Sequence, residues 1–148
     1  MGIAAALAAL DGAIQAVVPV RSQGVPFIPL PDRARITPNS RGRLFDLTVT
    51  GSGDPGLTGF RTRRQHLIDL TVLYPVGFGG LGEESITIAE DVAKLTVALG
   101  ESNVGAMAGV GVVYPPAEHT IEPITPEDRD SPVGLVVTLP FVVETQEA

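Results

Sequence analysis

The clearest alternation of apolar and polar positions lies in residues 65–74, QHLIDLTVLY, which we expect to form the central strand of a sheet. One face of this segment is mixed, and the other carries Ile68, Leu70, Val72 and Tyr74. A two-residue period with one apolar face is typical of a half-buried strand in an antiparallel or mixed sheet. Residues 43–50 alternate in the same way, with Phe45, Leu47 and Val49 facing inward, and predict the neighbouring strand.

The last strand is expected over residues 133–143, where every second residue is apolar. Its inner face would carry Val133, Leu135, Val137, Leu139, Phe141 and Val143. Pro140 cannot donate a backbone hydrogen bond, which predicts an edge position or a bulge. Shorter strands are expected at residues 108–114 and 118–124, and Gly109 and Gly111 leave one face of the first bare, so that something can approach closely there.

Two segments show helical spacing instead. In residues 2–18 and 84–99, apolar residues recur at steps of three and four, which predicts one buried stripe on each helix. The stripes consist of Ile3, Leu7, Leu10, Ile14 and Val17 in the first helix, and Ile88, Val92, Leu95 and Leu99 in the second. Thr87 and Glu90 have the spacing of a capping box, and Gly100 suits the position just past the end of the second helix.

Two connections are unusual. Residues 20–42 hold four prolines among several arginines, which disfavours helix and central strand. This segment is either an extended arm lying on a neighbouring subunit or a surface excursion. Residues 51–64, GSGDPGLTGFRTRR, separate two good strands and predict a long protruding hairpin loop with a basic end. The glycines of this loop match neither common phosphate-binding spacing.

These elements predict an α+β fold. We expect a single domain over residues 1–148, with a mixed or antiparallel sheet of about four strands. An N-terminal helix and a second helix would back the sheet. A chain of this length buries enough surface to stand on an ordinary hydrophobic core.

The distribution of charge is uneven along the chain. Residues 33–64 hold seven arginines against two aspartates, whereas residues 83–148 hold twelve acidic residues against Lys94 and Arg129. One interpretation is a well-solvated surface. The other is a head-to-tail assembly in which the basic part of one copy meets the acidic part of the next. The overall net charge of −7 argues against a dedicated nucleic-acid-binding protein.

Candidate chemistry is sparse. The chain has no cysteine, and its two histidines, His66 and His119, lie far apart in the sequence. His66 shares the inner face of the central strand, where packing is the commoner role. We expect no catalytic, cofactor or metal site and no enzymatic activity; His66, Tyr74 and Tyr114 are the only candidates to line a ligand pocket, and they form no recognised set.

The alanine- and leucine-rich beginning of the chain does not read as a membrane segment. No basic residue precedes it, as a signal peptide would require, and Asp11 and Gln15 interrupt a run too short to span a bilayer. We therefore expect an amphipathic helix and no membrane association.

The order of expected elements resembles the tail terminator (tail completion) proteins of long-tailed phages and phage-like particles. Four features carry the resemblance: the apolar N-terminal helix, the hairpin RLFDLTVTG…RTRRQHLIDLTVLYP, the helix at residues 84–99, and the closing strand LVVTLPFVVE after a charged turn. The proline-rich arm and the end of the chain just after the last strand depart from the family pattern.

The resemblance implies a structural virion protein that forms a ring, expected to contain six copies. Such a ring would cap the tail tube, contact the tube protein and a head-completion or neck protein, and let DNA pass without reading its sequence. The implied location is the tail or neck of the virion, and the host cytoplasm before assembly.

A ring with cyclic symmetry joins two different patches of the same chain. The basic end of the hairpin, Arg61, Arg63 and Arg64, is the expected partner of an acidic turn, Glu127, Asp128 and Asp130, on the next copy. Exposed ion pairs contribute only about 0–1 kcal/mol each, so apolar strand edges would have to provide most of the association.

Three alternatives remain open at this point. The chain could be another neck or head-completion protein, a small dimeric α+β enzyme or ligand-binding protein, or a nucleic-acid-binding protein that uses its arginine-rich half. Scarce aromatic residues disfavour the last of these.

Overall fold

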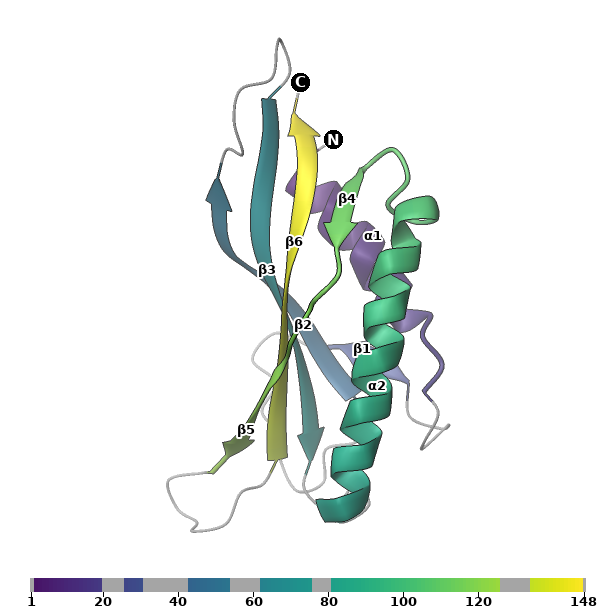
Figure 1. Ribbon diagram of the computed structural model, residues 1–148, viewed down its shortest axis with the longest axis vertical. Coiled ribbons are helices and arrows are strands. Elements are labelled where there is room, and N and C mark those ends of the chain that lie inside the picture. Colours follow the sequence, from purple (N-terminus) through teal and green to yellow (C-terminus); the bar gives the residue numbers. More distant parts are fainter. Residues whose placement is uncertain are drawn as a thin grey trace.

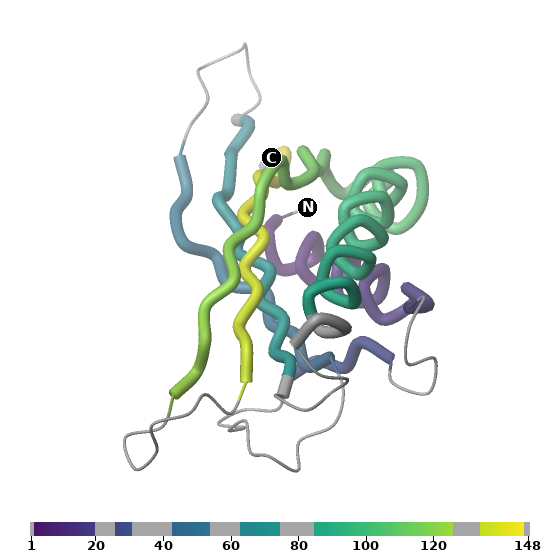
Figure 2. The backbone as a smooth tube through the Cα atoms, turned by 60° about the horizontal axis from the view of Figure 1, so that its bottom comes forward, coloured from purple at the N-terminus to yellow at the C-terminus, as the bar shows by residue number. Residues whose placement is uncertain are grey.

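A computed structural model gives the fold, and it describes residues 2–19, 26–30, 43–53, 62–75, 81–125 and 134–147. The chain folds as an α+β domain in which a curled mixed sheet has both helices packed against one of its faces (Figures 1 and 2). The elements are α1 (Ile3–Gln15), β1 (Phe27–Pro29), β2 (Arg43–Gly53), β3 (Thr62–Pro75), α2 (Leu81–Glu101), the short 3₁₀ helix η1 (Ser102–Val104), β4 (Gly111–Tyr114), β5 (Thr120–Ile124) and β6 (Gly134–Glu147). The α+β class and the two helices backing a sheet are as predicted.

The centre of the sheet is the strand that the sequence singled out. β3 pairs antiparallel with β2 on one side and with β6 on the other, and the pairing with β6 runs over the whole length of both strands. The predicted inner face of β3 is buried, from Ile68 through Tyr74 at every second residue. His66 continues this row and is buried as well.

β6 does not lie at the edge of the sheet, which was one of the two positions predicted for it from Pro140. It pairs with β3 on one side and with both β4 and β5 on the other, so it lies inside the sheet. Along β6, the pairing with β5 ends at Thr138 and the pairing with β4 starts at Val142. Residues 139–141 of β6 therefore have no partner on that side among the described strands. Pro140 therefore lies at an interruption of the neighbouring edge, where a missing N–H costs no ladder hydrogen bond.

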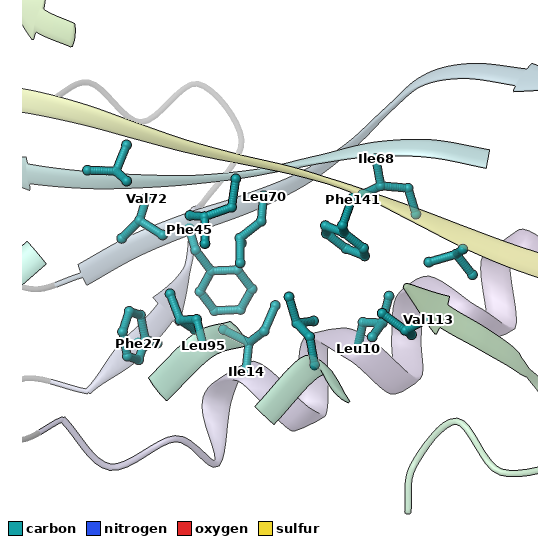
Figure 3. Packing of buried hydrophobic residues seen from close by; sticks show 14 of the residues in the cluster. Leu10, Ile14, Phe27, Phe45, Ile68, Leu70, Val72, Leu95, Val113 and Phe141 are labelled. Carbon is teal, nitrogen blue, oxygen red and sulfur yellow. The ribbon is translucent and has the colours of Figure 1, made fainter. Parts of the chain in front are cut away.

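The core fills the space between this sheet and the helices (Figure 3). Leu10 and Ile14 of α1 meet Leu95 of α2 and the inner faces of β2, β3 and β6. The predicted stripes are confirmed, with Leu10, Ile14, Ile88, Leu95 and Leu99 buried and the other members packed against them or partly buried. Burial of one such aliphatic side chain contributes about 1.5–3 kcal/mol.

Several predicted boundaries change. The sheet has six strands rather than about four. β1 was not predicted, whereas both short strands expected after α2 are present, as β4 and β5, and pair with β6. α2 begins at Leu81, so Thr87 lies inside the helix and cannot cap it as predicted. The hairpin loop is shorter than residues 51–64, because β2 extends to Gly53 and β3 starts at Thr62.

The glycines that precede Tyr114 behave as the sequence suggested. A Cβ at Gly111 would lie 2.6 Å from the carbonyl oxygen of Glu144, so only glycine permits the close pairing of β4 with β6. Gly109 has a φ of 78°, a conformation that residues with side chains adopt with strain.

Of the proline-rich segment 20–42, the structure describes residues 26–30. β1 pairs in parallel with the start of β2, from Phe27 opposite Arg43 to Pro29 opposite Phe45. The Leu30 N–H then donates to the Phe45 carbonyl at 2.7 Å. Leu30 and Arg43, the described residues on either side of positions 31–42, thus both lie at this edge of the sheet. Residues 20–25 and 31–42 of the predicted arm lie outside the described residues.

Candidate functional site

The predicted interface residues are only partly within the described chain. Arg63 and Arg64 lie in β3, where successive side chains point to opposite faces of the sheet. Arg61 and the acidic residues of the predicted contact, Glu127, Asp128 and Asp130, lie outside the described residues. The contact between the basic and acidic groups therefore stays a prediction.

Arg63 has a partner within its own chain. Its Nη1 lies 3.4 Å from Oε1 of Glu144 on the adjacent strand β6, and Tyr114 Oη lies 3.4 Å from Oε2 of the same carboxylate. These three side chains border a hollow of about 370 Å³ at the β4 end of the sheet. The Arg63 side chain is 58% exposed, so this ion pair contributes little stability and leaves the guanidinium accessible.

Tyr74, His66 and Tyr114 do not converge on one pocket. Tyr74 and His66 lie eight residues apart on β3, which separates them by roughly 26 Å along a strand. Tyr114 projects from the outer face of the sheet, while both others project toward the helices. The structure instead places each of the two buried side chains in a separate polar cluster.

The first cluster is a buried ion pair that the sequence reasoning missed. Arg43 of β2 and Asp91 of α2 have side chains that are 0% and 1% exposed, and Arg43 Nε donates to Asp91 Oδ2 at 2.5 Å. Tyr74 Oη donates to the same oxygen at 2.7 Å. The guanidinium also lies over the ring of Phe27 from β1, 5.7 Å from its centroid. The cluster therefore ties four elements together: β1, β2, β3 and α2.

Burial, and then the neighbouring Asp91 carboxylate, raise the pKa of Tyr74 far above its ordinary value. Both causes disfavour the phenolate, since a charge at this position would lose its hydration and be repelled by Asp91. Tyr74 is thus held as a neutral donor to the carboxylate.

The second cluster surrounds His66 at the opposite end of β3. Its Nδ1 is hydrogen-bonded to Ser52 Oγ of β2 at 2.8 Å, and its Nε2 to Thr145 Oγ1 of β6 at 3.0 Å. In a neutral imidazole one nitrogen donates and the other accepts, so the two hydroxyls take complementary roles.

A serine hydrogen-bonded to a histidine supplies two of the three members of a nucleophilic triad. In such a triad the second ring nitrogen is oriented by a carboxylate, whereas Thr145 places a hydroxyl at that nitrogen of His66. What the arrangement supplies is a hydrogen-bonded link across β2, β3 and β6.

The described part of the chain offers little else of chemical interest. Among its residues, no group of three or more His, Cys, Asp or Glu side chains is placed to hold a metal ion. None of the described helices has both the length and the apolar character needed to cross a bilayer.

The sequence did contain a signal for the first cluster. Asp91 lies three residues after Ile88 and four before Leu95, which places it on the buried stripe of α2, and Arg43 shares parity with Phe45. A charged residue on each of two inner faces is the pattern of a buried pair.

Comparison with known proteins adds no relative. No protein-family model matches the chain, and a search of curated protein sequences finds no match.

Proposed function

We propose that this chain is a structural virion protein of a long-tailed phage or phage-like particle. Six copies form a ring that terminates the tail tube and provides the surface for joining the head. The tube protein and a head-completion or neck protein are its partners, and DNA passes through the ring without sequence-specific contacts. The chain resides in the host cytoplasm before assembly and in the tail or neck of the virion afterwards.

The observation that carries this proposal is the order of elements around the central hairpin. An apolar N-terminal helix, the β2–β3 hairpin, α2 and the closing strand β6 occur in the order on which the resemblance to tail terminator proteins rests. The two helices cover one face of the sheet (Figures 1 and 2).

Two further observations support assembly. Arg63, at the start of β3, has an accessible guanidinium, and Arg64 beside it is exposed, so both can reach a neighbouring copy. None of the described helices covers the outer face of the sheet, which exposes Leu67, Val112 and Tyr114. Uncovered apolar side chains of this kind are common where proteins associate.

Native mass spectrometry of the full chain tests the proposal. We expect a closed ring of six copies, and a monomer or dimer at micromolar concentration would overturn it. Electron microscopy of the chain mixed with tail tubes then distinguishes a terminator, which caps the tube end, from another neck protein, which does not.

The contact assigned to the hairpin needs its own variant. Reversing both charges with Arg63→Glu and Arg64→Glu should reduce the ring to smaller species, because like charges would then face the acidic turn of the next copy. Lys94→Glu, on the exposed side of α2, is the matched control and should leave the mass unchanged. Rings that persist in the double variant would refute the assigned contact but not the ring.

A further inference from the structure

Within the described residues, β2 leaves one edge of the sheet unpaired over much of its length. β1 covers only the first three residues of β2, and its pairing ends where Leu30 donates to the Phe45 carbonyl. Over residues 46–53, β2 pairs with β3 alone among the described strands. Figure 1 shows this part of β2 at the side of the sheet away from β4.

The backbone groups on this edge can be assigned. In an antiparallel pair, successive residues direct their N–H and C=O groups alternately toward and away from the partner strand. The Phe45 carbonyl points away from β3, since it accepts from Leu30. Leu47 and Val49 have the same parity, so their N–H and C=O groups face the open edge. The bulge at Thr50 interrupts this alternation and limits the open row to those two residues.

A hollow lies beside the same backbone. It measures about 240 Å³ and is bounded by α1, by the end of β1 and by the start of the open edge. Its apolar walls come from Leu7, Pro29, Leu30 and Leu47. Among the described residues that line it are two acids, Asp11 and Asp46, and no lysine or arginine. The hollow has the size for an aliphatic side chain, and its acids favour a cation nearby.

The other edge of the sheet is built differently. Pro115 and Pro116 separate β4 from β5, and β5 itself contains Pro123. Proline on an edge strand discourages further pairing. β5 also carries Glu122, whose charge would be repelled by Asp46 if β5 of a second copy joined the open edge of β2. We therefore do not expect β5 of a second copy to pair with the open edge of β2.

We infer that residues 46–49 and the adjoining hollow form a docking site for an extended segment of a partner polypeptide. The segment adds as a strand to β2 through the outward groups of Leu47 and Val49. One of its aliphatic side chains enters the hollow, and a neighbouring lysine or arginine faces Asp46. In strand addition of this kind, main-chain hydrogen bonds give affinity and side-chain pockets give specificity. This inference is independent of the proposed ring.

The test uses a capped peptide, Thr-Lys-Val-Lys-Val-Thr, titrated into the ¹⁵N-labelled full chain and followed by NMR. Alternation in a strand places its valines on the side of the hollow and its lysines on the side of Asp46. We expect saturable shifts of the Leu47 and Val49 amides. The same peptide with glutamates for lysines should bind weakly, and one with N-methylated valines should not bind.

Two variants of the chain sharpen the test. Val49→Pro removes an outward N–H without removing a bond to β3, and we expect affinity to fall about tenfold. Asp46→Lys should weaken binding of the lysine peptide and strengthen binding of the glutamate peptide. Glu122→Lys, on the opposite edge, should change neither, and circular dichroism establishes that all three variants are folded.

Several results would overturn the inference: no saturable shift, equal binding by Val49→Pro, or equal binding of the two peptides. Without peptide, a native mass of Val49→Pro below that of the wild type would show that a second copy of the chain occupies this edge. That result would refute the inference that the occupant is a basic segment of a partner polypeptide. A chain that is monomeric yet binds the peptide would refute the ring and leave this site standing.

Discussion

The two ends of β3 each bury a polar side chain, and they satisfy its hydrogen bonds with different kinds of partner. Each end places a polar side chain, Tyr74 or His66, in the row that faces the helices, and each gives it partners on neighbouring elements. At the Tyr74 end the partners are a buried cation and anion, whereas at the His66 end they are two hydroxyls. This contrast indicates where the stability of the fold depends on a single side chain.

A buried charge stays tolerable only while its counter-charge is present. Removing one partner leaves the other uncompensated, which is far more costly than losing a hydrogen bond between neutral groups. The Arg43 cluster should therefore be sensitive to single substitutions, and the His66 cluster tolerant of them.

The largest effect is expected from Asp91→Ala. It removes the Asp91 carboxylate from the buried Arg43 guanidinium, and unfolding in urea should show a loss of about 3–5 kcal/mol. Glu101→Ala, on the exposed side of the same helix, is the control and should stay within about 0.5 kcal/mol.

Replacing both charged residues together distinguishes the effect of an unbalanced buried charge from the effect of lost packing. Arg43→Met with Asp91→Leu removes both charges and should be more stable than Asp91→Ala, because apolar residues of similar volume often replace a buried pair without loss. A double variant that is less stable than the single one would contradict this account.

Tyr74→Phe should come next. At neutral pH it removes a hydrogen bond to a charged group, with an expected loss of about 1.5–3 kcal/mol. The pKa of Tyr74 is raised in the folded chain, so above about pH 10 the unfolded state releases this proton while the folded state keeps it. The wild type should therefore lose up to about 1.4 kcal/mol of stability for each further pH unit through this group.

Measured from pH 8 to 11, Tyr74→Phe should show a shallower alkaline loss of stability than the wild type. Tyr114→Phe is the control, since the other tyrosine of the chain is about half exposed. Parallel curves for the wild type and Tyr74→Phe would show that Tyr74 ionises equally in both states.

The smallest effects are expected in the His66 cluster. Thr145→Val keeps the shape of the side chain but removes the hydroxyl from His66 Nε2, with an expected loss of about 1 kcal/mol. Ser52→Ala should cost less, because Ser52 lies on an exposed part of β2. If Thr145→Val cost as much as Asp91→Ala in the same urea titration, the contrast between the two ends would fail.

The sequence predicted the parts of the fold that repeat with a strong period. The inner faces of β3 and β6 and the stripe of α2 follow directly from the spacing of their apolar residues. β1 was missed because a three-residue strand carries no period, and prolines around it indicate a loop. Its pairing depends on a parallel contact with β2, which is invisible to local reasoning.

The polar sites were harder to predict for another reason. Arginine and aspartate are usually exposed, so residue type alone does not indicate that Arg43 and Asp91 are buried, although both share the parity of buried neighbours. Their burial depends on contacts between residues 48 positions apart. The placement of Arg63 beside Glu144 likewise depends on the register of β3 against β6.

The interruption between β4 and β5 should make this part of the sheet tolerant of insertions. Residues 115–119, five in number, stand opposite residues 139–141, three in number, because Tyr114 pairs with Val142 and Thr120 with Thr138. The strand pairs on either side are already uncoupled in register. Ala117 and Glu118 are exposed. We expect that a short tag or a fluorescent label inserted between them would leave the pairing of β4 with β6 and of β5 with β6 unchanged.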